Sequence, residues 1–218
     1  MIHRRGPLPA SLVLIAISAL TLSSCGTGDG SDGNGNPAVA ETAGTPSASP
    51  TAPEPSRTDR PRISLPADLS YVFDWPRTGD KEKDAVLADS EQSIKAVDLA
   101  IVSQNALDPA YLHYYEGKAA AGTEKFIQEY VDQKATITGN YRFYEPRLAV
   151  REDGTAALSY CEDQGRAYVK YLRDNKIRKT EVTAKSYVEY HTSLKKDADG
   201  VWKVQGVSSK SGSAACQP

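Results

Sequence analysis

The aromatic residues of this chain are confined to its later part, and this restricts where a hydrophobic core can form. All 17 of them (12 Tyr, 3 Phe and 2 Trp) lie at or after Tyr71, and none occurs among the first 70 residues. Aromatic side chains contribute the largest buried areas in protein cores. We therefore expect a folded domain in the later part of the chain and none in the earlier part.

The first 25 residues have the layout of a secretory signal. A charged start with two arginines precedes an apolar stretch over residues 8–22, which is too short and interrupted to span ~30 Å of hydrocarbon. The segment closes with Leu22-Ser23-Ser24-Cys25, which resembles the lipobox of bacterial lipoproteins. The resemblance implies cleavage after Ser24 and a diacylglyceryl group on the Cys25 sulfur, anchoring the chain at the extracytoplasmic face of the cell membrane. The alternative is an ordinary cleaved signal peptide with a chance cysteine.

The other two cysteines are Cys161 and Cys216. An even number of cysteines in an exported, oxidising setting favours a disulfide between them. Closing a loop of about 55 residues would stabilise the fold by ~4 kcal/mol at most in the chain-entropy model. The alternative, a catalytic thiol pair, lacks the Cys-x-x-Cys spacing that lowers a thiol pKa.

Composition divides the exported chain into two parts. Between residues 26 and 63, 26 of 38 residues are Gly, Pro, Ser, Thr or Ala, so this stretch is expected to be a disordered tether. Residues 64–218 contain every aromatic residue and have the usual size of a single domain. The formal net charge of −2 gives no basic footprint and disfavours a nucleic-acid partner.

Helical signals come first in this domain. Thr78-Gly79-Asp80 offers an N-cap for a long amphipathic helix over residues 81–107. Its apolar stripe contains Leu87, Ser90, Ile94, Val97, Ile101 and Asn105. Asp108-Pro109 predicts the start of a short helix that continues through Tyr115, and Gly117 is expected to end it. Thr123 is expected to cap a third helix, whose apolar face has Phe126, Ile127, Tyr130 and Val131.

The periodicity then changes to two, which is typical of strands. We expect strands over residues 138–152, 155–163, 167–172, 181–195 and 201–207. Pro146 marks a bulge or an edge site in the first of these strands, and Asp153-Gly154 predicts a hairpin turn. Asp163 is interpreted as a turn residue before Gln164-Gly165. The inward face of the long fourth strand is expected to carry Val182, Ala184, Val188, Tyr190 and Leu194. The order predicts an α+β fold with helices packed on an antiparallel meander.

Three segments in this order resemble the nuclear transport factor two-like fold, as carried by secreted lipoproteins of actinobacteria. They are Asp108-Pro109-Ala110-Tyr111-Leu112-His113-Tyr114-Tyr115, Ser159-Tyr160-Cys161-Glu162-Asp163 and Asp199-Gly200-Val201-Trp202-Lys203-Val204. The resemblance implies a curved sheet wrapped over helices, with a conical pocket between them. The fold hosts isomerases, dehydratases and many non-catalytic modules, so it does not decide function.

Candidate functional residues are few. Asp98 lies at the edge of the apolar stripe, where a half-buried carboxylate in a pocket could act as a general base; the alternative is an Asp that reaches water. Under the fold resemblance, a cavity would be lined by Asp98, Tyr111, Tyr114, Tyr141, Tyr160 and Tyr190. Glu162 and Asp163 are expected on opposite faces of a strand. Only His113 and His191 remain after export, which predicts no metal site, and no cofactor motif is present.

Two functions compete. The favoured hypothesis is a lipid-anchored envelope protein whose domain is a non-catalytic binding or interaction module for an apolar small molecule or an envelope protein. The alternative is a small-molecule pocket enzyme of isomerase or dehydratase type with Asp98 as general base. A pocket with convergent polar groups would favour the enzyme.

Overall fold

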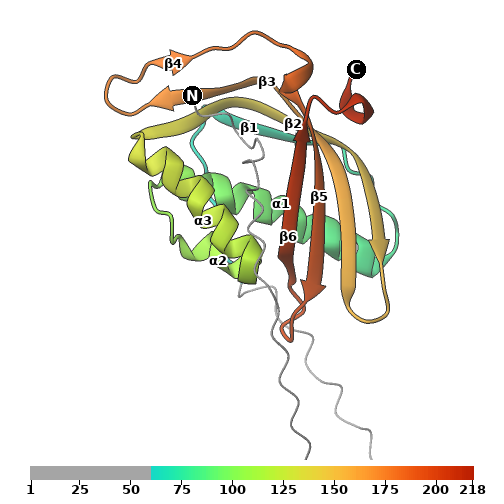
Figure 1. The fold of residues 1–218 in the computed structure, drawn as a ribbon. Coiled ribbons are helices and arrows are strands. Elements are labelled where there is room, and N and C mark those ends of the chain that lie inside the picture. Colours follow the sequence, from blue (N-terminus) through green and yellow to red (C-terminus); the bar gives the residue numbers. More distant parts are fainter. Residues whose placement is uncertain (1–59) are drawn as a thin grey trace, which may run out of the picture. The chain divides into compact units, whose positions relative to one another are not determined.

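The computed structural model describes residues 60–218; the predicted signal peptide, Cys25 and most of the predicted tether lie outside the described residues. The described part is α+β, with three helices packed on a six-stranded, mostly antiparallel sheet (Figure 1). This confirms the predicted fold class. The helices are α1 (Lys81–Val102), α2 (Pro109–Tyr114) and α3 (Gly117–Asp132). The strands are β1 (Leu69–Phe73), β2 (Ala135–Val150), β3 (Thr155–Tyr171), β4 (Ile177–Arg178), β5 (Tyr187–Lys196) and β6 (Trp202–Ser211).

The sheet has the order β1-β2-β3-β5-β6, with the short β4 paired to β3. β1 is parallel to β2, with Tyr71 opposite Tyr141 and Phe73 opposite Phe143, while the other pairs are antiparallel. Sequence analysis missed β1. Its five residues form a parallel ladder with a strand some 70 positions later, and such a distant pairing leaves no local turn signal.

Helix α1 begins as predicted but ends earlier. The Asp80 side chain accepts hydrogen bonds from the backbone N–H groups of Glu82 and Lys83, which confirms the N-cap. The predicted end at residue 107 is wrong, because Gln104 adopts φ +54 and turns the chain. Its side-chain amide donates to the carbonyls of Ile101 and Ala135, so the turn is held by a tertiary contact.

The next two helices follow after a short turn. Asp108 caps α2 through the N–H of Ala110, as predicted. Gly117 does separate α2 from α3, with φ +57, but α3 already begins there. The predicted cap at Thr123 is therefore wrong: this residue is buried inside α3. The alanines of residues 117–122 are strong helix formers and extend the helix towards its N-terminus.

Strands β2 and β3 form the longest pair of the sheet. Their register shifts between Tyr144 and Arg147, which confirms the bulge at Pro146, and Gly154 turns the hairpin with φ +75. The predicted break at Gln164-Gly165 is wrong: β3 continues through it, because its partner β2 pairs as far as Tyr171. Gly139 in β2 has φ +104, and a Cβ there would lie 2.1 Å from the carbonyl oxygen of Arg166. The close approach of the two paired strands at this position therefore requires glycine.

Strand β5 is shorter than predicted and β6 is longer. Val188, Tyr190 and Leu194 are buried as expected. Val182 is 57% exposed, and Ala184 lies in a short 3-10 helix, η2 (Ala184–Ser186), so neither belongs to the inward face of the strand. The chain forms this 3-10 helix instead of a strand, and the capping-box hydrogen bonds between Thr183 and Ser186 stabilise it.

A disulfide joins Cys161 in β3 to Cys216, as predicted, with 5.5 Å between their Cα atoms. It fixes the C-terminal 3-10 helix η3 (Ala214–Cys216) against the sheet, where the Tyr144 hydroxyl donates to the carbonyl of Cys216. At the other end of the described chain, Ile63 packs on the core and Arg60 forms an ion pair, although both fall in the stretch predicted as tether. Within residues 60–218, no helix combines the length and apolar character needed to cross a membrane.

Candidate functional site

The six residues predicted to line a cavity all lie in the core between the helices and one face of the sheet. Asp98 comes from α1, Tyr111 and Tyr114 come from α2, and the other tyrosines come from successive long strands of the sheet. Each is at most 4% exposed. The rings of Tyr160 and Tyr190 stack at 5.2 Å across β3 and β5. These residues therefore belong to the packed core, and their lining of a ligand cavity stays a prediction.

Asp98 is enclosed by the fold rather than placed at a water-exposed edge. Its exposed fraction is 0%, so the expectation of a half-buried or water-exposed carboxylate is wrong. The hydroxyl of Tyr71 donates a hydrogen bond of 2.7 Å to its Oδ2 atom. Tyr71 belongs to β1, the strand that sequence analysis missed. Burial of the carboxylate therefore depends on a segment that packs over α1 from a distant part of the chain.

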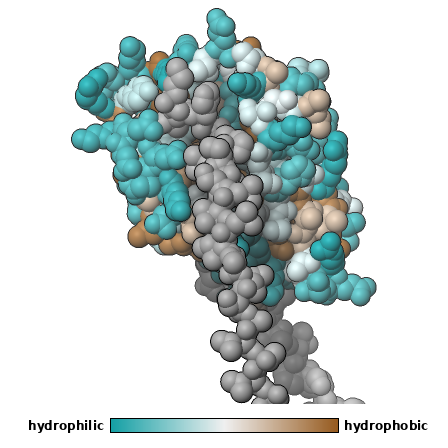
Figure 2. Space-filling view, viewed as in Figure 1, coloured by the Kyte–Doolittle hydropathy of each residue, from teal (hydrophilic) through white to brown (hydrophobic). Residues whose placement is uncertain are grey.

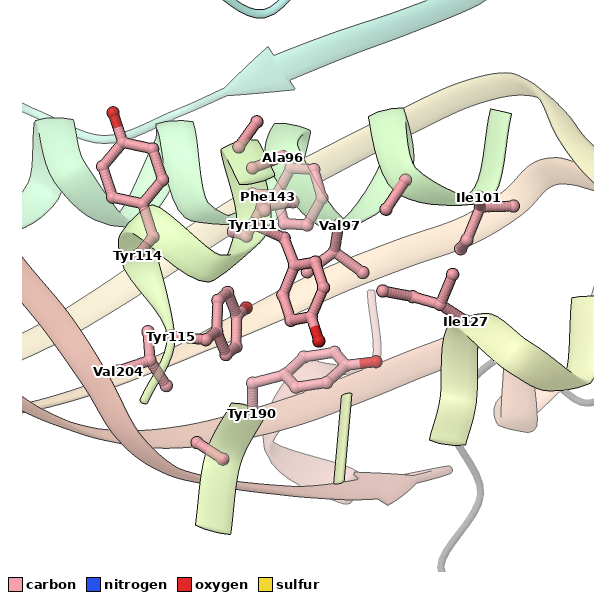
Figure 3. Packing of buried hydrophobic residues seen from close by; sticks show 14 of the residues in the cluster. Ala96, Val97, Ile101, Tyr111, Tyr114, Tyr115, Ile127, Phe143, Tyr190 and Val204 are labelled. Atoms are coloured by element: carbon pink, nitrogen blue, oxygen red, sulfur yellow. The ribbon is translucent and has the colours of Figure 1, made fainter. Parts of the chain in front are cut away.

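The tyrosines of α2 point in different directions. Figure 3 shows Tyr111 directed towards Tyr190 and Ile127, whereas Tyr114 points away from that pair. Burial raises the pKa of Tyr111, and the nearby Glu124 raises it further. Burial also raises the pKa of Tyr114 to about 12, with Asp89 contributing. The six predicted residues share one core but do not converge on one point.

A second polar cluster, which sequence analysis missed, surrounds Asp89 in α1. This carboxylate is 2% exposed and accepts hydrogen bonds from Arg60 Nε (2.8 Å) and Nη2 (3.0 Å). The backbone N–H of Trp202 donates a third bond of 3.0 Å. The hydrogen bond to Asp89 raises the pKa of Arg60. Asp89 lies outside the apolar stripe of the predicted helix, so the sequence pattern did not single it out.

The histidines, Glu162 and Asp163 do not lie together in one catalytic arrangement. His113 packs edge-on against Tyr114 at 4.8 Å, and burial lowers its pKa, with Lys203 adding to the effect. His191 is exposed. Glu162 faces the core at 0% exposure and accepts from Gln164, while Asp163 accepts from the N–H of Gly165. Within residues 60–218, no group of three or more His, Cys, Asp or Glu residues is arranged to hold a metal ion.

The structure has a hollow of about 330 Å³ that none of the predicted residues lines. Its lining residues come from β2, β3 and β5: Arg147, Leu148, Ala149, Ala157, Leu158, Ser159, His191 and Thr192. It is open to solvent, and none of its lining residues is Asp or Glu; Arg147 and His191 instead approach Glu145 (3.6 Å) and Glu189 (3.5 Å), which do not line it. This hollow does not have the convergent acid and base groups of a catalytic pocket.

No protein-family model and no curated protein matches the sequence. Among solved structures, the chain is similar to a ketosteroid isomerase-like protein from Erwinia carotovora atroseptica (12% identity, TM-score 0.42, covering 62% of this chain and 98% of that one). It is also similar to a putative scytalone dehydratase from Novosphingobium aromaticivorans (8%, 0.42, 60% and 86%). A third similar structure is a nuclear transport factor 2-like superfamily protein from Salmonella enterica serovar Typhimurium (8%, 0.40, 59% and 92%). These likenesses concern the fold, and no activity is inferred from them.

Proposed function

We propose that this chain is a lipid-anchored protein of the cell envelope whose α+β domain acts outside the cytoplasm as a non-catalytic binding or interaction module. The burial and hydrogen bonding of Asp98 are the observations that support a non-catalytic role. The carboxylate is fully enclosed, and its Oδ2 atom already accepts the Tyr71 hydroxyl at 2.7 Å. A general base must instead reach a proton of the substrate directly or through one water.

The extracytoplasmic location is supported by cysteine chemistry. A disulfide between Cys161 and Cys216 is stable in an oxidising compartment and is rare in a reducing cytosol. The lipobox-like Leu22-Ser23-Ser24-Cys25 supplies the anchor. The anchor and the disulfide involve different cysteines, so each can be removed by substitution without changing the other.

Fatty-acid labelling tests the anchor. In a bacterial host fed an alkyne-tagged fatty acid, the wild-type chain should incorporate the label and lose its first 24 residues. Cys25→Ala should incorporate none, because the thiol that receives the diacylglyceryl group is gone. The control variant Cys161→Ala/Cys216→Ala should label like the wild type. Equal labelling of Cys25→Ala and wild type would exclude lipidation at Cys25.

The alternative, an isomerase- or dehydratase-type enzyme with Asp98 as general base, predicts a different stability response. Removing a catalytic carboxylate commonly leaves stability unchanged or raises it. A structural carboxylate that accepts a hydrogen bond contributes about 1.5–3 kcal/mol. We expect Asp98→Asn and Tyr71→Phe each to lower the free energy of unfolding, with less than additive loss in the double variant. A stabilised Asp98→Asn would favour the enzyme.

A further inference from the structure

Positive charge is concentrated in one hairpin of the sheet. Residues 165–182, named here the basic arm, comprise the end of β3, the following turn, β4 and the segment after it. They contain six basic residues and two acidic ones, a net charge of +4. The whole chain carries −2, so the remainder carries −6. The charge of the protein is therefore strongly asymmetric, although its total is near zero.

Most of this charge faces solvent. The basic residues of the arm are Arg166, Lys170, Arg173, Lys176, Arg178 and Lys179. Lys170 pairs with Asp68 at 3.1 Å, and Arg173, whose side chain is 87% exposed, approaches Asp174 at 3.5 Å. Within residues 60–218 the other four have no carboxylate at ion-pair distance. Lys134 adds an exposed cation beside the turn, where its carbonyl accepts from the N–H of Leu172.

The same arm exposes apolar side chains. Leu172 is 41% exposed, Ile177 is 42% exposed and Val182 is 57% exposed. Leu172 and Ile177 lie on either side of the polar turn. In Figure 1 the β3–β4 hairpin projects at the upper left, and Figure 2 shows mainly hydrophilic residues over the same corner. Binding to a membrane interface strengthens with the apolar area that is inserted and with electrostatic attraction to anionic lipids, and the arm exposes side chains of both kinds.

We propose that the basic arm docks onto the surface of an anionic phospholipid bilayer. Charge complementarity attracts the arm, and Leu172, Ile177 and Val182 distinguish a bilayer from a soluble polyanion, because a polyanion offers no apolar phase for them. This docking would extend the proposed function and rests on it, since the proposed anchor keeps the domain near a membrane. A lipid anchor and a basic patch together bind a protein to a membrane more tightly than either does alone.

The chain is long enough for both contacts. Thirty-four residues separate Cys25 from Arg60, and the covalent geometry of that many residues permits a span of at most about 110 Å. This limit exceeds the diameter expected of a domain of ~155 residues. The arm can thus reach the bilayer that holds the anchor.

Vesicle binding of the chain from Gly26 to Pro218 tests the proposal, since this chain retains every described residue and lacks the anchor. It should sediment with vesicles of phosphatidylcholine containing about 30% phosphatidylglycerol and not with phosphatidylcholine alone. Raising the salt from about 50 mM to about 500 mM should weaken binding, because the screening length falls from about 14 Å to about 4 Å. Absence of a preference for anionic vesicles would overturn the proposal.

Matched variants separate the arm from the rest of the surface. Each basic residue near an anionic membrane changes binding about fivefold, so Arg173→Gln/Lys176→Gln/Lys179→Gln should bind on the order of 100-fold more weakly. The control Lys118→Gln/Lys125→Gln/Lys210→Gln removes the same charge from exposed positions elsewhere. Equal losses in the two triple variants would overturn the assignment to the arm. Thermal unfolding of each variant checks that the fold is intact.

A third variant distinguishes a bilayer from a soluble polyanion. Leu172→Ser/Ile177→Ser should weaken vesicle binding several-fold and leave binding to soluble polyphosphate unchanged. If the vesicles bind this variant as tightly as the wild-type chain, and polyphosphate competes fully, the arm is a general polyanion site and the bilayer proposal is wrong. The anchor is tested separately by labelling at Cys25, so failure here leaves the proposed anchoring intact.

Discussion

Removing the guanidinium of Arg60 should expose how much of the domain's stability depends on the cluster around Asp89. Arg60→Met keeps most of the side-chain stem and removes both hydrogen bonds to the carboxylate, at 2.8 and 3.0 Å. Asp89, at 2% exposure, then retains the N–H of Trp202 as its partner in this cluster. A buried carboxylate that loses its cation destabilises a protein by about 3–5 kcal/mol.

The expected loss is smaller than that range because the Arg60 side chain is 30% exposed. Solvent already screens part of the ion pair, so we expect Arg60→Met to lower the free energy of unfolding by about 2–3 kcal/mol. Asp89→Asn, which keeps one acceptor oxygen and removes the charge, should cost about 1–2 kcal/mol. The double variant should lose about 1–2 kcal/mol less than the sum, because the charge that Arg60→Met leaves unpaired is no longer present.

Urea unfolding of the chain from Gly26 to Pro218, followed by the combined fluorescence of Trp75 and Trp202, measures these differences. Arg62→Met is the matched control, since Arg62 is exposed two residues away and its loss should change stability by less than about 0.5 kcal/mol. If Arg60→Met and Arg62→Met unfold at the same urea concentration, or if the single effects are additive, the ion pair does not stabilise the fold as argued.

Three further predictions follow from buried groups. The Tyr111 hydroxyl is fully buried with no hydrogen-bond partner among the described residues, so Tyr111→Phe should raise the free energy of unfolding by about 1 kcal/mol; a loss in urea unfolding would indicate a partner for the hydroxyl and favour a ligand cavity. Cys161→Ala/Cys216→Ala should lower stability by about 2–4 kcal/mol, because the disulfide closes a separation of 55 residues; an unchanged denaturation midpoint would contradict this. Burial lowers the pKa of His113, so the unfolded chain binds a proton that the folded chain resists. Stability should fall as the pH drops below about 6.5, and His113→Gln should flatten that dependence; a parallel pH profile for the variant would refute the assignment to His113.

Several parts of the fold were accessible from the sequence because nearest neighbours determine them. The Asp80 and Asp108 caps, the turn at Gly154 and the bulge at Pro146 each depend on residues within a few positions of one another. The pairing of Cys161 with Cys216 followed from counting the cysteines of an exported chain. The concentration of aromatic residues after Tyr71 located the domain, since a core forms where large apolar side chains are available.

Other parts were decided by contacts between distant segments. β1 exists because it pairs with β2, and β3 continues past Gly165 because β2 resumes pairing with it at Arg166. Asp98 was predicted at a half-buried edge, but Tyr71 packs over it from 27 positions away. Asp89 lies off the predicted apolar stripe and is nevertheless buried, because Arg60 and the backbone N–H of Trp202 provide its hydrogen bonds. The periodicity of a helix shows which face a residue occupies, whereas its burial and its partners depend on chain segments that the local sequence does not specify.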